Sequence, residues 1–247
     1  MKAILKLYPL ALVCGLWELS ARLEWIDPFF LPPFSEALRA VVASPDVVTD
    51  SLVSLARAFG GLVVGGGTGL LCGMLMARYR PIDDFLSPIV GALFPTPKLA
   101  LFPLLMLWFG LGEGSKVAII AITAFFPVVL NTYAGMRGVD KFLIWNALTK
   151  GASPRQMMLR VMLPAAMPFI FTGFRVATSF SFLLVVAAEM LNASNGLGYR
   201  ILYAERTYES ALMYGGIIVV ATLGFIVDRL IGRLGKRVLA WQDVAHQ

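Results

Sequence analysis

The sequence predicts an all-α, polytopic membrane protein with six transmembrane helices. The first observation is composition: of 247 residues, 58% are hydrophobic and 15% are charged, whereas soluble domains average about 45–50% and about 25%. The second is that six separate apolar segments approach the roughly 20 residues that a membrane-spanning helix needs. Since no long polar linker or tandem repeat interrupts them, we expect one transmembrane domain over residues 1–247.

Each predicted span is a mostly apolar run bounded by charged or proline-containing stretches. The third contains Pro95, Pro97 and Pro103. Proline has no N–H to donate within a helix, so we expect a break at the first two. The six spans run from about Ile4 to Ala21, Leu52 to Met76, Phe85 to Leu111, Lys116 to Tyr133, Ala166 to Leu191 and Ala211 to Ile231.

The net charge of +6 fits membrane anchoring better than nucleic-acid binding, because the basic residues lie mostly between apolar segments. Lys2 and Lys6 before an apolar run also resemble a signal peptide, but the later spans favour a retained first helix. With both termini in the cytoplasm, six basic residues fall outside: Arg22, Arg39, Arg57, Lys116, Arg200 and Arg206. Thirteen fall inside: Lys2, Lys6, Arg78, Arg80, Arg137, Lys141, Lys150, Arg155, Arg160, Arg229, Arg233, Lys236 and Arg237. This bias predicts cytoplasmic termini.

The residues needed for several kinds of catalysis are missing from the sequence. Cys14 and Cys72 lie in separate apolar segments, and His246 is the single histidine. They provide neither a zinc site nor a nucleophile–histidine pair. The stretch Gly110–Lys116 resembles a phosphate-binding loop, but Ser115 separates the last glycine from the lysine. We therefore predict a non-enzyme with no cofactor of its own.

The second span has glycine at every fourth position: Gly61, Gly65, Gly69 and Gly73. Residues four apart share a helix face, and small residues there let another helix approach closely. This pattern favours packing within the subunit, with a dimer or gate contact as the alternative.

Two connections are long enough to have structure of their own. The segment at about residues 22–50 is predicted to be external, and the segment at about residues 134–165 to be cytoplasmic. Within the second, we predict a helix before Gly151, a turn, and a helix from Arg155 that ends at Pro164.

Charged residues inside predicted spans are candidates for the translocation pathway, because they are costly in lipid. Lys98 follows the Pro95–Pro97 break, and Arg175 and Glu189 lie in the fifth span. One hypothesis is that Lys98 and Arg175 favour an anionic solute. The alternative is that both extend toward the cytoplasmic boundary. Glu189 would pair with a cation or support the external gate, and we expect intramembrane carboxylates to be almost absent apart from it.

The cytoplasmic segment resembles the "EAA" loop of ABC importer permeases. That pattern is Glu-Ala-Ala, three residues, Gly, nine residues, an Ile-like residue, any residue, Leu, Pro. The matching residues are Ala147, Gly151, Val161, Leu163 and Pro164. The start differs, because Trp145 and Asn146 stand where Glu and the first Ala are expected. This departure removes any ionic contact that the Glu would supply.

Further segments, from Phe30 to Trp241, resemble the nitrate/sulfonate/taurine branch of these permeases. They are Phe30–Pro33, Ala100–Leu104, Trp108–Gly112, Ser115–Lys116, Leu163–Pro168, Thr172–Arg175, Ala188–Glu189, Gly196–Tyr199 and Trp241. The resemblance implies a type I ABC importer permease fold and a location in the bacterial inner membrane.

The resemblance also implies an ATP-driven mechanism with several partners. A second permease copy, two cytoplasmic ABC ATPases that bind ATP and Mg, and an extracytoplasmic substrate-binding protein would complete the importer. The ATPase would receive a coupling loop that contains Trp145, Asn146, Ala147, Gly151, Ala152, Ser153, Pro154, Arg155, Leu163 and Pro164.

The implied solute is a small anion such as a sulfonate, taurine or nitrate. The alternatives are a thiamine-precursor pyrimidine or another small organic solute for an ABC permease. Two other classes of protein remain as alternatives to an ABC permease: a secondary transporter and a membrane-embedded enzyme. The first of these would need ion-coupling residues in the membrane, and the second would need paired carboxylates or metal ligands.

Overall fold

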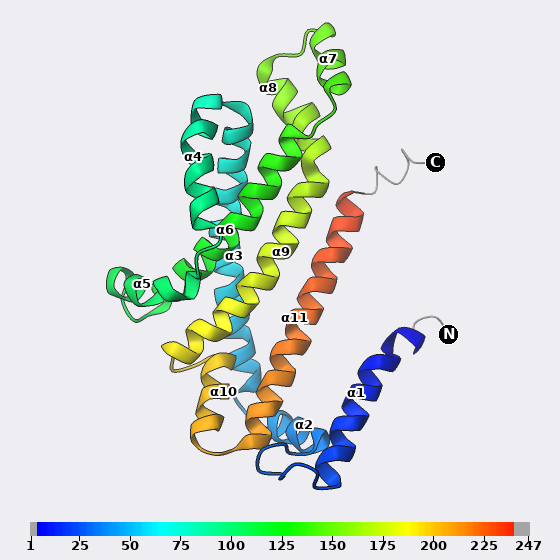
Figure 1. Cartoon of the computed structure of the whole chain (residues 1–247), viewed down its shortest axis with the longest axis vertical. Coiled ribbons are helices and arrows are strands. Elements are labelled where there is room, and N and C mark those ends of the chain that lie inside the picture. Colours follow the sequence, from blue (N-terminus) through cyan, green and yellow to red (C-terminus); the bar gives the residue numbers. More distant parts are fainter. Residues whose placement is uncertain (1–3, 240–247) are drawn as a thin grey trace. The chain divides into compact units, whose positions relative to one another are not determined.

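The computed structural model describes residues 4–239, apart from the side chains of residues 4–7 and 10. Every element in this range is helical, which confirms the all-α prediction (Figure 1). Lys2, Trp241 and His246, used in the sequence predictions, lie outside the described residues. The elements are α1 (Ile4–Arg22), α2 (Phe34–Ala43), α3 (Val47–Arg78), α4 (Arg80–Leu93), η1 (Lys98–Leu101), α5 (Phe102–Phe109), α6 (Glu113–Arg137), α7 (Lys141–Thr149), α8 (Pro154–Gln156), η2 (Met157–Met162), α9 (Leu163–Leu191), α10 (Leu197–Arg206) and α11 (Ser210–Val238).

Within residues 4–239, four helices are long and apolar enough to cross a membrane: α3, α6, the continuous helix Pro154–Leu191, and α11. A bent pair, Arg80–Leu93 and Lys98–Phe109, makes a fifth span if it is counted as one. With 19 residues, α1 would extend about 28 Å at the usual helical rise. It coincides with the first predicted span, and a total of six remains a prediction.

The third predicted span is not one helix. It is divided into α4, the short 3₁₀ helix η1 and α5, with a bend of 97° between its two halves. Pro95 and Pro97 lie in the gap, where neither has to donate a helical hydrogen bond. Pro103 is at the start of α5, where proline is tolerated. The predicted break is confirmed, and it places Lys98 at the start of the short 3₁₀ helix η1.

The prediction of a helix that ends at Pro164 was wrong, because the helix continues through this residue into α9. The preceding segment η2 is π-helical, and the Leu163 N–H donates to the Met158 carbonyl five residues back. This wider turn accommodates a proline, which can neither donate to the usual carbonyl nor approach it closely.

The described chain divides into two compact units. The first consists of the residues up to Leu55 together with Glu189–Leu223. In it the Trp17 indole donates to the Pro32 carbonyl at 2.9 Å. Gly215 of α11 lies against α2, where an added Cβ would come within 2.5 Å of the Ala37 carbonyl oxygen. Small and aromatic residues therefore hold α1, α2 and the first part of α11 together.

The second unit consists of Ala56–Ala188 and the chain from Gly224 onward. Its α3 packs against α6 through the glycine stripe predicted from the sequence. A Cβ at Gly65 would lie 2.0 Å from the Ala121 carbonyl oxygen, and one at Gly69 would lie 2.7 Å from that of Phe125. The stripe therefore faces a helix of the same chain, as the favoured interpretation predicted.

Candidate functional site

The segment between α6 and α9 has a short helix, a defined turn and a second capped helix. The Asp140 side chain accepts from the Phe142 N–H at 2.8 Å and so caps α7. At the other end, the Gly151 N–H donates to the Leu148 carbonyl at 2.9 Å, and the Ala152 N–H donates to that of Ala147 at 3.0 Å. These two bonds form a Schellman motif, and Gly151 has the φ of +74° that this motif usually requires.

The turn leads directly into the next helix. Ser153 and Gln156 form a capping box, with hydrogen bonds of 3.3 and 2.9 Å, and Pro154 occupies the first turn of the helix. From Pro154 the helix runs without a break to Leu191. The segment therefore joins a spanning helix through continuous hydrogen-bonded backbone, and it projects from the ends of α6 and α9 (Figure 1).

The short helix α7 presents an apolar surface to its surroundings. None of its residues is buried. Phe142 and Trp145 are 73% and 57% exposed, and their rings contact edge to face at a centroid distance of 5.7 Å. Leu143 and Leu148 are exposed as well. Exposed aromatic side chains grouped on one helix mark an interaction surface.

The structure places the other predicted loop residues around this helix and turn. Asn146 and Ala147 lie in α7, and the Asn146 carbonyl accepts from the Thr149 hydroxyl. Arg155 is exposed in α8. Leu163 and Pro164 begin α9 rather than end a separate helix.

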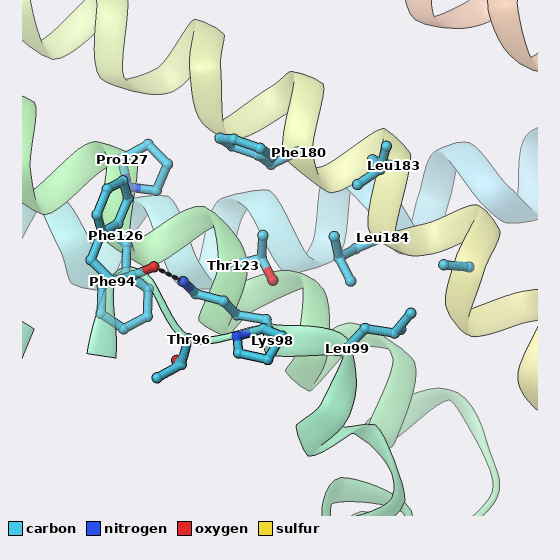
Figure 2. Close-up of a pocket in the computed structure, with 12 residues that line it drawn as sticks. Phe94, Thr96, Lys98, Leu99, Thr123, Phe126, Pro127, Phe180, Leu183 and Leu184 are labelled. Carbon is cyan, nitrogen blue, oxygen red and sulfur yellow. Dashed lines mark hydrogen bonds between the residues drawn. The ribbon is translucent and has the colours of Figure 1, made fainter. Parts of the chain in front are cut away.

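A second candidate site is a pocket of about 360 Å³ beside the break between α4 and α5. Its lining residues are Phe94, Thr96, Pro97, Lys98, Leu99, Thr123, Phe126, Pro127, Phe180, Leu183, Leu184 and Ala187. Figure 2 shows the Lys98 chain extended along the pocket toward Phe94 and Phe126. Apolar side chains predominate around a single ammonium group.

The Lys98 ammonium group is partly satisfied by this pocket. It donates to the Phe94 carbonyl and lies 4.7 Å from the centre of the Phe126 ring. An ammonium group has three donors. The arrangement can offer positive charge and hydrogen bonds to a small anion, in apolar surroundings that strengthen both. Pro97 lines the same pocket, whereas Pro95, two residues earlier in the sequence, does not.

Arg175 is not brought to the Lys98 pocket. Its guanidinium group forms two hydrogen bonds with the Asp228 carboxylate, at 2.6 and 2.8 Å. The expectation that intramembrane carboxylates are almost absent apart from Glu189 was therefore wrong, because Asp228 lies within α11. The sequence signal was present, since Asp228 falls inside the sixth predicted span.

Glu189 lies in the first unit and is 1% exposed. Its carboxylate accepts from the Ser54 hydroxyl at 2.8 Å and from the Gly198 N–H at 2.9 Å. The Leu197 N–H in turn donates to Ser54 at 2.9 Å. Glu189 and Ser54 thus hold the start of α10, with Gly196 at a φ of +102°.

Asp50 and Arg200 extend this buried network. Asp50 is 4% exposed, accepts from the Gly196 N–H at 2.7 Å and pairs with Arg200. Burial lowers the pKa of Arg200, but hydrogen bonds to Asp50 and Asp46 outweigh this, so its pKa lies above the ordinary value. The sequence does not reveal that Asp50, Ser54 and Arg200 belong to one network, because their partners are distant in the chain.

No group of three or more potential metal ligands occurs within the described part of the chain.

Residues 65–240 match the family described as "Binding-protein-dependent transport system inner membrane component". The chain belongs to this family. It is therefore an ABC importer permease subunit, a multi-pass membrane protein whose family has a transport role rather than an enzymatic one.

Similar proteins cover nearly the whole permease. A putative ABC transporter permease of Methanocaldococcus jannaschii is 34% identical over 98% of this chain and 93% of its own. A putative aliphatic sulfonates transport permease of Bacillus subtilis is 33% identical over 94% and 86%. The taurine transport system permease of Escherichia coli is 32% identical over 94% and 87%.

Solved structures support the predicted fold. A chain of the MetNI methionine ABC transporter, in an inward-facing conformation, has a TM-score of 0.70 at 19% identity, covering 78% of this permease and 95% of that chain. A chain of an amino acid ABC transporter has a TM-score of 0.62 at 21% identity, with 82% and 97% coverage. At these identities the likeness shows the fold alone, and that fold is the ABC importer permease fold.

Proposed function

We propose that this permease forms the translocation pathway for a small anion of the sulfonate or taurine class, with Lys98 as the cationic group that the solute meets. The observation that supports this most directly is the pocket of about 360 Å³ in which Lys98 is the charged lining residue. Relatives at 33% and 32% identity are named for aliphatic sulfonates and taurine. A sulfonate has an anionic head and a short organic tail, which suit one ammonium group among apolar side chains.

Arg175 has a different role in this proposal from that of Lys98. Its two hydrogen bonds to Asp228 offset its charge. We assign it to holding α9 and α11 together rather than to contact with the solute. Glu189 likewise supports the turn before α10, because its carboxylate is occupied by Ser54 and Gly198.

A second candidate solute is a pyrimidine of the thiamine-precursor type. One relative, the formylaminopyrimidine transport permease of Halalkalibacterium halodurans, is 29% identical over 92% of this chain. The aromatic rings of Phe94, Phe126 and Phe180 in the pocket lining would suit such a ring.

The energy for transport comes, in this proposal, from two ATPase subunits that bind ATP and Mg and receive one α7 each. Phe142, Trp145 and Leu148 supply the exposed contact surface of α7. The Schellman turn at Gly151 and the helix from Pro154 transmit movement to the spanning helix. The contact is apolar, because Trp145 takes the place of the family's glutamate.

The remaining parts of the importer follow from the same assignment. A second copy of this chain would complete the pathway, and an extracytoplasmic binding protein would deliver the solute. The excess of basic residues in alternate connections supports a cytoplasmic position for α7 and both termini.

The test is uptake by proteoliposomes that contain the assembled transporter and its binding protein. Loss of a hydrogen bond to a charged group costs about 1.5–3 kcal/mol, so Lys98→Gln should reduce taurine or alkanesulfonate uptake by about ten- to a hundredfold. Lys98→Arg should retain most of the activity. Normal uptake by Lys98→Gln would exclude the anion assignment, and retained uptake of a neutral pyrimidine alone would favour the second candidate.

A further inference from the structure

A pocket of about 490 Å³ lies between α9 and α11, in the second unit and apart from the Lys98 pocket. It is lined by Arg175 of α9 and by one face of α11: Phe225, Asp228, Arg229, Gly232, Arg233 and Lys236. The lining therefore combines four cationic side chains with one carboxylate. That carboxylate is already paired with Arg175.

In the described part of the chain, the other three cationic side chains have N–H donors that are not used in hydrogen bonds. Within residues 4–239, neither the Arg233 nor the Lys236 side chain has a hydrogen-bond or ion-pair partner. The Arg229 guanidinium group lies 4.8 Å from the centre of the Phe225 ring, and its side chain forms no hydrogen bond within the same residues. The space between these side chains is open at Gly232, where an added Cβ would meet no atom within 4 Å.

An apolar pocket of about 320 Å³ adjoins the basic one and shares Arg175, Gly232 and Lys236 with it. Its other lining residues include Phe171, Ile231 and Leu239. A ligand that filled both spaces would be anionic at one end and apolar at the other. Both pockets are formed by helices apolar enough to span a membrane, and Lys236 lies two residues before the end of α11.

We propose that this basic pocket binds the phosphate of an anionic phospholipid headgroup, with the start of an acyl chain in the adjoining apolar pocket. A phosphodiester is an acceptor-only anion, which suits Arg233 and Lys236. Basic pockets between spanning helices are suited to anionic headgroups. A free phosphate or sulfonate would use the same cations but would leave the apolar pocket empty.

The test is native mass spectrometry of the assembled transporter in nonionic detergent, titrated with dioctanoyl phosphatidylglycerol. Each cation near a lipid surface contributes about 1 kcal/mol, so Arg233→Gln combined with Lys236→Gln should weaken binding by roughly thirtyfold. Arg237→Gln is the matched control, since Arg237 is also exposed on α11 but does not line the pocket. Its affinity should stay within about twofold of the wild type.

A second variant, Gly232→Leu, keeps every charge and fills the open space, and it should also reduce binding. Dioctanoyl phosphatidylcholine should bind weakly, and millimolar inorganic phosphate or taurine should not displace phosphatidylglycerol. Equal weakening by Arg237→Gln would overturn the site, as would unchanged binding in both the double variant and Gly232→Leu. Displacement by phosphate or taurine at concentrations equal to the lipid would show a small-anion site and refute the lipid assignment.

Discussion

Replacement of Gly65 by alanine should force α3 away from α6. The new Cβ would lie 2.0 Å from the Ala121 carbonyl oxygen and 2.7 and 2.8 Å from the carbonyl and α carbons of the same residue. All three are backbone atoms, so no side chain can move to relieve the contact. To restore an ordinary separation, the helices would have to move apart by more than 1 Å, at a cost of roughly 1–3 kcal/mol or more.

This cost is partly offset, since alanine favours a helix over glycine by about 1 kcal/mol. We therefore expect Gly65→Ala to lower the free energy of unfolding by about 1–2 kcal/mol, which corresponds to a fall in Tm of about 2–8 °C for a chain of this size. The assay is thermal unfolding of the purified transporter in detergent, followed by near-UV circular dichroism.

Gly67→Ala provides a matched control two residues away on the same helix. No atom lies within 4 Å of a Cβ built at Gly67. Alanine at position 67 clashes with no neighbour and favours the helix more than glycine does, so the Tm of this variant should be unchanged or slightly raised. Equal Tm values for the two variants would refute the conclusion that the glycine stripe is required by packing against α6.

Three other substitutions test separate features. Gly151→Val should reduce transport-coupled ATP hydrolysis without loss of the spanning helices. A β-branched residue at a φ of +74° costs about 1–3 kcal/mol and would distort the turn between α7 and the next helix; unchanged coupling in proteoliposomes would contradict the role of this turn. Glu189→Gln should destabilise the chain by about 1–3 kcal/mol. Oε1 accepts from Ser54 and Oε2 accepts from Ser54 and Gly198, and in glutamine one of these oxygens is replaced by an NH2 group that cannot accept; a thermal melt identical to the wild type would argue against the network. Asp228→Asn should leave Arg175 without its ionic partner and so lower the Tm. In a double-mutant cycle, the double variant Asp228→Asn with Arg175→Gln should recover part of this loss, and strictly additive effects would show that the two side chains are not coupled.

Local chemistry explains why parts of this structure could be predicted from the sequence. Pro95 and Pro97 predicted the break in the third span, because proline removes a donor wherever it occurs. Gly151 predicted the turn after α7 for a similar reason, since glycine tolerates a positive φ. The same rule wrongly predicts a helix end at Pro164. The π-helical segment before this residue accommodates the proline within a continuous helix, and the sequence pattern does not reveal a π-helical turn.

The electrostatic pairs could not be predicted in the same way. Ser54 and Glu189 are 135 positions apart, and Arg175 and Asp228 are 53 apart. A single sequence shows that each charge lies near a span, but the partner depends on which helices pack together. Lys98 is a candidate from the sequence alone because it follows the proline break. The aromatic side chains around it come from three separate segments, with Phe94 just past the end of α4, Phe126 in α6 and Phe180 in α9.

The central claim, that α7 of this permease meets an ATPase subunit, is tested most directly by photocrosslinking. Trp145 is replaced by p-benzoylphenylalanine in the intact transporter. As a control, the same residue is introduced in place of Trp108, another exposed tryptophan, on α5. Irradiation should join the permease to the ATPase from position 145 and not from position 108. No ATPase adduct from position 145, or an adduct from position 108 alone, would contradict the assignment of α7 as the coupling helix.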